Sequence, residues 1–124
     1  NLSPGKYKLI DHKVPIRPDS QYGISKVFGE ATGRYYHEYY NMDVSCLRIG
    51  TFNAENKPNN IRSLSTWVSY RDLSHMIEMC LINQKGYEIF YGVSDNLWKI
   101  WDIEHAKSTI GYKPLDNAEI YRTK

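Results

Sequence analysis

The chain has 124 residues, of which 41% are hydrophobic and 24% are charged, and its formal net charge is +2. This length suits one domain at most. The basic residues are scattered, whereas a nucleic-acid interface needs a concentrated basic face. No apolar run is long enough to span a bilayer, and the first residues show no signal-peptide pattern. We therefore expect no nucleic-acid partner, no membrane insertion and a cytoplasmic location.

Residues 1–17 show no periodicity, and we interpret them as an irregular segment. A helix over residues 20–40 follows, because Pro18, Asp19 and Ser20 suit a helix start and Asn41 suits a left-handed stop. Apolar side chains recur in it at spacings of three and four, which predicts a buried stripe. The stripe consists of Ile24, Val27, Phe28, Ala31 and Tyr35.

Two chemically useful side chains lie off this stripe. Tyr22 and Lys26 are one turn apart on one helix face, and Gly29 and Gly33 continue the Lys26 side. Without side chains at these glycines, another helix or a ligand can approach closely. An ammonium group beside a phenol favours the phenolate, which can exchange a proton with a substrate hydroxyl or carbonyl. The alternative is an ordinary exposed contact between neighbouring turns.

The next segments predict a strand, a loop and a helix. Residues 44–49 are apolar and bounded by Asp43 and Gly50, as in a strand buried on both faces. Residues 51–66 form a long polar loop, a length more typical of functional loops than of connectors. Ser69 with Asp72 resembles a capping box, opening a helix that extends to about Asn83. Its predicted core stripe is Leu73, Met76, Ile77, Cys80 and Leu81.

The last part of the chain predicts a second strand over residues 88–93, a short helix over 102–109 that ends at Gly111, and an irregular tail. Strand, helix and strand make a βαβ unit with parallel pairing. Two parallel strands cannot stand alone, and no GxGxxG motif occurs. We infer an α/β fold: the C-terminal half of a Rossmann-type doubly wound parallel sheet, lacking the N-terminal dinucleotide-binding βαβ units. Residues 1–124 then form a single partial domain.

The remaining candidate residues favour structural roles. Cys46 and Cys80 fall in a predicted strand and on a predicted helix face, as small core residues with reduced thiols. Neither CxxC nor HxxxH spacing occurs, so we expect no metal site and no disulfide. Arg48, inside the first strand, is expected to pair with a carboxylate. Trp98 and Trp101 can wall a sugar pocket, but core packing is the favoured interpretation.

A longer pattern surrounds the Tyr22–Lys26 pair. RPDSQYGISKVFGE, residues 17–30, resembles the active-site helix of extended short-chain dehydrogenases/reductases, which carry a YxxxK arrangement. Within that superfamily the pattern is most similar to uronate dehydrogenases and their NAD-dependent epimerase/dehydratase relatives. The resemblance continues through LRIG at 47–50, STWVS at 65–69, YGVS at 91–94 and WD at 101–102.

This resemblance implies an NAD-dependent oxidoreductase acting on a sugar or sugar acid. Tyr22 is then the catalytic acid/base, and Lys26 holds the phenolate and hydrogen-bonds the nicotinamide ribose of NAD. Ile49 is implied as a cofactor contact and Thr51 as a substrate contact, although Thr51 can instead cap its own turn. Arg62 is implied to bind the substrate carboxylate, against the alternative of a solvated loop arginine.

The resemblance also implies what the chain needs from elsewhere. The family's partner serine or threonine lies in an N-terminal half that is missing here, so we expect the isolated fragment to be inactive. The favoured reaction is oxidation of the anomeric hydroxyl of a hexuronate to an aldarolactone. A nucleotide-sugar epimerase or dehydratase, and a non-catalytic cofactor-sensing protein, remain as alternatives. A homo-oligomer formed through helix 20–40 is a further expectation.

Overall fold

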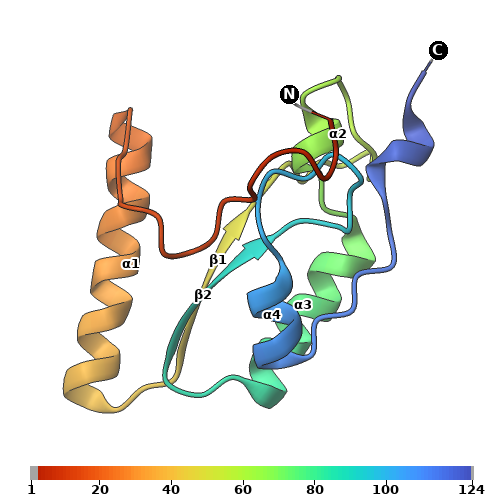
Figure 1. Ribbon diagram of the computed structural model, residues 1–124. Helices are drawn as coiled ribbons and strands as arrows, with labels where there is room; N and C mark the ends of the chain where they lie inside the picture. The colour runs from red at the N-terminus through yellow and green to blue at the C-terminus, as the bar shows by residue number, and fades with distance from the viewer. Residues whose placement is uncertain (1–2, 124) are drawn as a thin grey trace.

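The computed structural model describes residues 3–123, so expectations for residues 1–2 and 124 lie outside the described residues. Among these residues no helix combines the length and the apolar character needed to cross a membrane. The structure is an α/β arrangement of helices around two strands (Figure 1). In chain order they are α1 (Gln21–Tyr40), β1 (Val44–Ile49), α2 (Ser63–Thr66), α3 (Tyr70–Asn83), β2 (Tyr87–Gly92), α4 (Glu104–Ile110) and the 3₁₀ helix η1 (Ala118–Tyr121).

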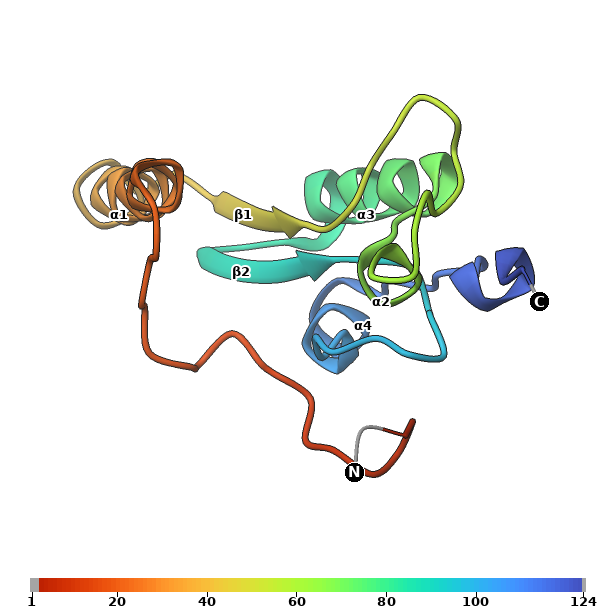
Figure 2. The same cartoon turned by 90° about the horizontal axis from the view of Figure 1, so that it is seen from above.

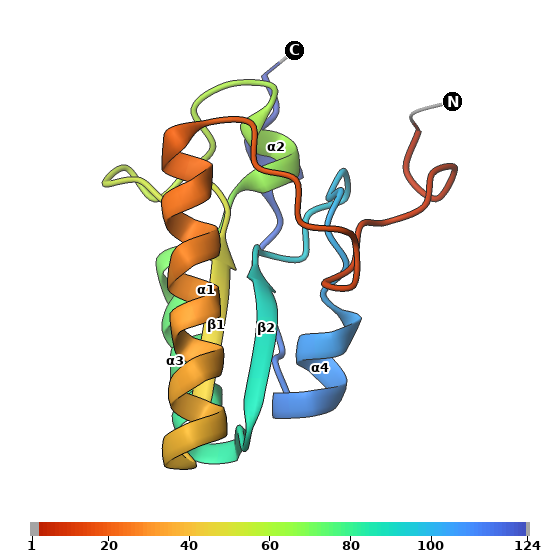
Figure 3. The same ribbon diagram turned by 90° about the vertical axis from the view of Figure 1, so that its left-hand side faces the viewer.

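The two strands form the predicted βαβ unit. β1 and β2 are parallel, in a register that runs from Val44 opposite Tyr87 to Ile49 opposite Gly92. The first strand has the predicted bounds, and the second begins and ends one residue earlier than predicted. The predicted burial of the first strand on both faces is wrong for the described residues, because residues 44–48 are half-buried and Ile49 is exposed. Figure 3 shows α3 behind β1, with α4 on the far side of β2 from α1. The sheet therefore separates α1 from α4.

The core lies where α3 and α4 meet the sheet. Met76, Phe90 and Tyr112 are buried together, with Ala106 and Ile110 from α4. The Tyr112 hydroxyl donates to the backbone carbonyl of Val93 at 2.8 Å, and burial raises the pKa of this phenol above its usual value.

The predicted core stripe of α3 is only partly correct. Leu73 and Met76 are buried, as expected. Ile77 and Leu81 are exposed, with Leu81 at 83%. In residues 3–123 they line an open cavity with β1 residues, because no described element packs over that side of α3.

The start of α3 is fixed by the Ser69 hydroxyl and by the buried carboxylate of Asp72. The Ser69 hydroxyl accepts from the Asp72 N–H at 3.1 Å, so the predicted cap is confirmed. The Asp72 carboxylate does not complete a capping box; it accepts from the Ser94 hydroxyl at 2.6 Å and from the N–H groups of Leu115 and Asp116. The tail is therefore tied to α3 and β2, and the expectation of an irregular tail misses η1.

The α1 helix has the predicted ends but presents a different face to the sheet. The Ser20 hydroxyl accepts from the Gly23 N–H, and Asn41 is left-handed with a φ of 56°. The predicted buried stripe is wrong: Ile24, Phe28 and Tyr35 are exposed, Phe28 at 71%. Gly33 lies against β1 instead, where a β-carbon would be 2.9 Å from the Val44 side chain. The sequence predicted that another helix or a ligand would approach Gly33 closely. In the structure the strand β1 occupies that position.

The segment before α1 connects the two sides of the sheet. Figure 2 shows it running from beside α4 to the start of α1. Ile10 forms an isolated bridge with Trp101, donating its N–H to Ile100 and accepting from Asp102, both at 2.8 Å. Trp101 stacks on Tyr91 with ring centroids 5.5 Å apart. Trp101 thus packs against the sheet, as the favoured interpretation expects.

The end of β1 is joined directly to α2, a helix that the prediction of a loop over 51–66 misses. Thr51 donates its N–H to the Thr66 carbonyl at 2.7 Å and accepts from the Val68 N–H at 2.9 Å. Gly50 makes this junction possible, because a β-carbon there would lie 1.9 Å from the Thr66 carbonyl oxygen. Four residues are too few to show helical periodicity in the sequence, and the bonds from Thr51 hold the end of α2 against β1.

Gly50→Ala should therefore destabilise the protein by about 1–3 kcal/mol, the usual cost of overpacking. Gly29→Ala is the matched control, because no heavy atom lies within 4 Å of its would-be β-carbon. Alanine in that helical position should be neutral or stabilising by up to about 1 kcal/mol. Denaturant unfolding of both variants measures the difference, and equal effects would contradict the close packing at Gly50.

Candidate active site

The predicted Tyr22–Lys26 pair forms on the first turns of α1. The Lys26 Nζ lies 5.0 Å from the centroid of the Tyr22 ring. Tyr22 is 72% exposed. Within residues 3–123, the Tyr22 hydroxyl has no hydrogen bond and the Lys26 ammonium has no ion pair. Their contact with each other is the one interaction that these two groups make there. Both polar groups therefore remain available to a ligand.

These side chains line a cavity of about 490 Å³ between α1 and the outer edge of β1. Its wall includes Ile49, so the structure brings together the three residues predicted to contact a cofactor. Gly29 contributes open space to this wall, because it lacks a side chain and has no close neighbour. The remaining lining residues are Glu30, Cys46, Leu47 and Arg48.

An ion pair anchors this cavity wall. Arg48 donates from Nε and from one terminal nitrogen to the two carboxylate oxygens of Glu30, each at 2.9 Å. Its other terminal nitrogen donates to the Tyr91 hydroxyl at 3.1 Å. The hydrogen bonds to Glu30 raise the pKa of Arg48 above its already high usual value. The expectation that Arg48 pairs with a carboxylate is confirmed.

The two predicted substrate residues lie outside this cavity. The hydroxyl of Thr51 pairs with that of Thr66 at 2.7 Å, an interaction that neither sequence alternative anticipated. Arg62 precedes α2, and its exposed guanidinium has no ion pair among the described residues. Asn60 and Ser63 fix its position: the Ser63 N–H donates to the Asn60 side chain at 2.8 Å, and the Ser63 hydroxyl donates to the Asn60 carbonyl.

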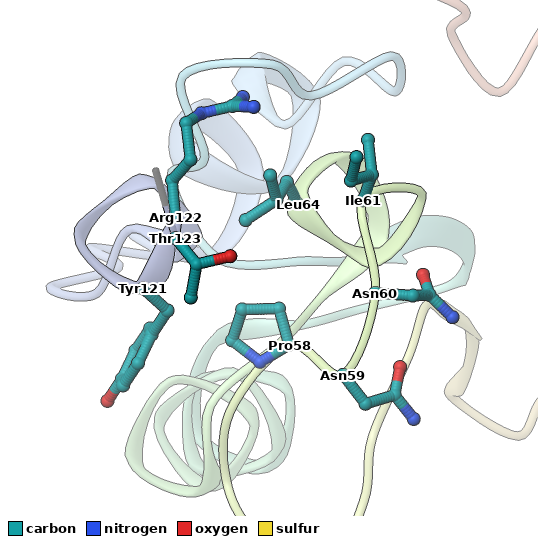
Figure 4. Close-up of a pocket in the computed structure, with 8 residues that line it drawn as sticks. All are labelled: Pro58, Asn59, Asn60, Ile61, Leu64, Tyr121, Arg122 and Thr123. Carbon is teal, nitrogen blue, oxygen red and sulfur yellow. The ribbon is translucent and has the colours of Figure 1, made fainter.

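A second groove, of about 220 Å³, is lined in part by residues that lie close to Arg62 in the sequence (Figure 4). It is formed by the loop before α2, by Leu64 and by the end of η1. Arg122 contributes to its wall while it donates from Nε to Glu119 at 2.5 Å. Sequence reasoning missed this groove, because its walls lie far apart in the chain. It also missed Glu30, although the spacing of four from Lys26 signals a shared face.

The other candidate groups offer no chemistry here. Cys46 and Cys80 are free and half-buried, and burial raises the pKa of both thiols. A thiol with a raised pKa is mostly protonated at neutral pH and is therefore a poor nucleophile. In residues 3–123 no cluster of His, Cys, Asp or Glu side chains is arranged to hold a metal ion.

Residues 4–87 match the NAD dependent epimerase/dehydratase family. The chain belongs to this family. It is 40% identical over 114 residues to an NAD-dependent glucose-6-phosphate dehydrogenase of Haloferax volcanii, covering 91% of this chain and 43% of that protein. It is 42% identical over 114 residues to a uronate dehydrogenase of Pseudomonas putida, covering 91% of this chain and 41% of that protein.

A solved structure gives the same likeness in three dimensions. The chain superposes on a uronate dehydrogenase from Agrobacterium tumefaciens, a mutant complexed with NAD, with a TM-score of 0.85 at 36% identity. The match covers 92% of this chain and 42% of that one. The predicted resemblance and the predicted Rossmann-type α/β fold are confirmed. The chain spans less than half the length of the relatives that it matches.

Proposed function

We propose that the protein is an NAD-dependent dehydrogenase that oxidises a sugar carrying an acidic group. The favoured reaction is oxidation of the anomeric hydroxyl of a hexuronate to an aldarolactone. The observation that carries the proposal is the Tyr22–Lys26 pair, which is free of other polar partners and faces a cavity. Relatives with 40% and 42% identity carry the names of sugar dehydrogenases, which supports the same reaction class.

The residues at this cavity fit one end of NAD. Lys26 supplies hydrogen-bond donors for ribose hydroxyls, Ile49 supplies an apolar wall, and the space beside Gly29 leaves room for a ring. The glycine-rich turn that holds the pyrophosphate does not occur in these residues. We therefore assign Tyr22, Lys26 and Ile49 to the nicotinamide end only. When bound, NAD supplies the acceptor for the hydride that leaves the sugar carbon.

The proton of the sugar hydroxyl needs a separate acceptor, and we assign it to the Tyr22 phenolate. We assign to the Lys26 ammonium, whose Nζ lies 5.0 Å from the centroid of the Tyr22 ring, the role of holding the phenolate during the reaction. A cofactor-sensing protein would need no such proton acceptor, so the pair favours an enzyme. An epimerase or dehydratase would use the same pair, and the names of the relatives favour the dehydrogenase.

The anionic group of the substrate is assigned to Arg62. A guanidinium makes two parallel, charge-assisted hydrogen bonds to a carboxylate or a phosphate. Arg62 has no competing ion pair in the described part of the chain, and the Asn60–Ser63 hydrogen bonds hold its backbone beside α2. Thr51, at the end of β1, is the proposed contact to a sugar hydroxyl, using the hydrogen-bonding capacity that its pairing with Thr66 leaves free.

Tyr22→Phe in a full-length protein that carries this chain should lower turnover at least ~100-fold, because it removes the proton acceptor and leaves the helix intact. The KM for the sugar should change less. The matched control is Tyr39→Phe, a similarly exposed tyrosine on the same helix, which should retain normal turnover. NADH absorbance measures both rates, and near-normal turnover of the Tyr22 variant would place the chemistry elsewhere.

Arg62→Lys should lower kcat/KM for a hexuronate roughly 10- to 100-fold, because an ammonium cannot reproduce the paired hydrogen bonds. Oxidation of neutral glucose should scarcely change. The same comparison with glucose 6-phosphate tests whether the anionic group is a phosphate instead. Equal losses on charged and neutral sugars would mean that Arg62 maintains the loop and does not bind the anion.

A further inference from the structure

We propose that Arg48 is a positioning residue for the Tyr22–Lys26 pair: by binding both carboxylate oxygens of Glu30, it leaves the Lys26 ammonium free to face Tyr22. This inference rests on the dehydrogenase function proposed above. It assigns to Arg48 an electrostatic role, in addition to its role in joining β1 to α1.

The spacing along α1 creates the competition. Tyr22, Lys26 and Glu30 follow one another at intervals of four residues and therefore share a helix face. Lys26 can lean toward the phenol on one side or toward the carboxylate on the other. An ion pair with Glu30 would draw the ammonium away from Tyr22, and the carboxylate would offset the positive charge that stabilises a phenolate.

The geometry of Arg48 decides this competition. Its two hydrogen bonds to Glu30 are both 2.9 Å long, and only 24% of the Arg48 side chain and 17% of the Glu30 side chain are exposed. A bidentate, largely buried pair is stronger than an exposed contact between neighbouring helical turns. The third contact, from Arg48 to Tyr91 on β2, prevents the guanidinium from following α1 away from the sheet.

Within residues 3–123, the lining of the two cavities beside Lys26 contains one carboxylate, that of Glu30. The charged or titratable residues that line the cavities on either side of Lys26 are Tyr22 and Glu30 from α1, Cys46 and Arg48 from β1, and Arg17 from the segment before the helix. Burial raises the pKa of Cys46, which keeps that thiol neutral at pH 7. Among these lining residues, Glu30 is the single acid, so its pairing with Arg48 controls the charge around Lys26.

Three variants separate this role from simple structural support: Arg48→Gln, Glu30→Gln and the double variant. In a full-length protein that carries this chain, Arg48→Gln should lower kcat at neutral pH about 10-fold and move the rise of activity to higher pH. Glu30→Gln breaks the same ion pair but leaves no carboxylate to capture Lys26. Its pH profile should therefore stay in place or move to lower pH. The double variant should recover the parent profile.

A second readout does not depend on activity. With ¹³C-labelled lysine, the side-chain methylene protons of Lys26 report their position over the Tyr22 ring by an upfield shift. Arg48→Gln should abolish this shift, whereas Glu30→Gln and the double variant should retain it. If Arg48→Gln does not fold, Arg48→Lys should show a smaller change in the same direction, because one ammonium cannot bind both carboxylate oxygens.

The outcomes distinguish this inference from the proposed function. A parent protein that oxidises no acidic sugar, but whose variants give the expected lysine shifts, would refute the function and support the role of Arg48. Equal losses of activity in all three variants, with Lys26 unmoved, would show that Arg48 only maintains the structure. That result would overturn the inference and leave the dehydrogenase assignment intact.

Discussion

The ion pair between Arg48 and Glu30 connects the helix that carries the proposed catalytic groups to the sheet. Its two hydrogen bonds place α1 against β1, and the bond from Arg48 to Tyr91 extends the connection to β2. Tyr91 continues it by donating from its hydroxyl to the Asp11 carbonyl at 3.3 Å. The segment that leads into α1 is thereby held at the same point as the helix. Gly33 complements the ion pair by allowing β1 to approach α1 closely.

The sequence was most informative where an element depends on its neighbours in the chain. The apolar run over residues 44–49 gave the bounds of β1, and Ser69 gave the start of α3, since each depends on neighbours in the chain. Tyr22, Lys26 and Ile49 were also predicted, and they line one cavity. Here the resemblance mattered most, because a tyrosine and a lysine at this spacing are common on ordinary helices.

The failures share a physical cause: each depends on contacts between distant segments. The apolar stripe of α1 predicts burial, but Gly33 and Glu30 decide which face meets the sheet. The end of α2 is held by Thr51 and approached closely by Gly50, which precede the helix by 12 and 13 residues. The groove between the loop before α2 and the end of η1 has walls that lie far apart in the chain. The exposed stripe of α1 is compatible with the predicted homo-oligomer. The homo-oligomer and the need for an N-terminal half both stay predictions.

In the proposed reaction, a base on α1 takes the proton of an anomeric hydroxyl while the hydride from the same carbon passes to NAD. Incubation of a full-length protein that carries this chain with NAD and a hexuronate deuterated at C1 tests it most directly. We predict that the deuterium appears in the reduced nicotinamide and that the sugar product is an aldarolactone. Deuterium retained in a product that is still a sugar acid, with no net formation of NADH, would contradict the claim and indicate an epimerase or dehydratase.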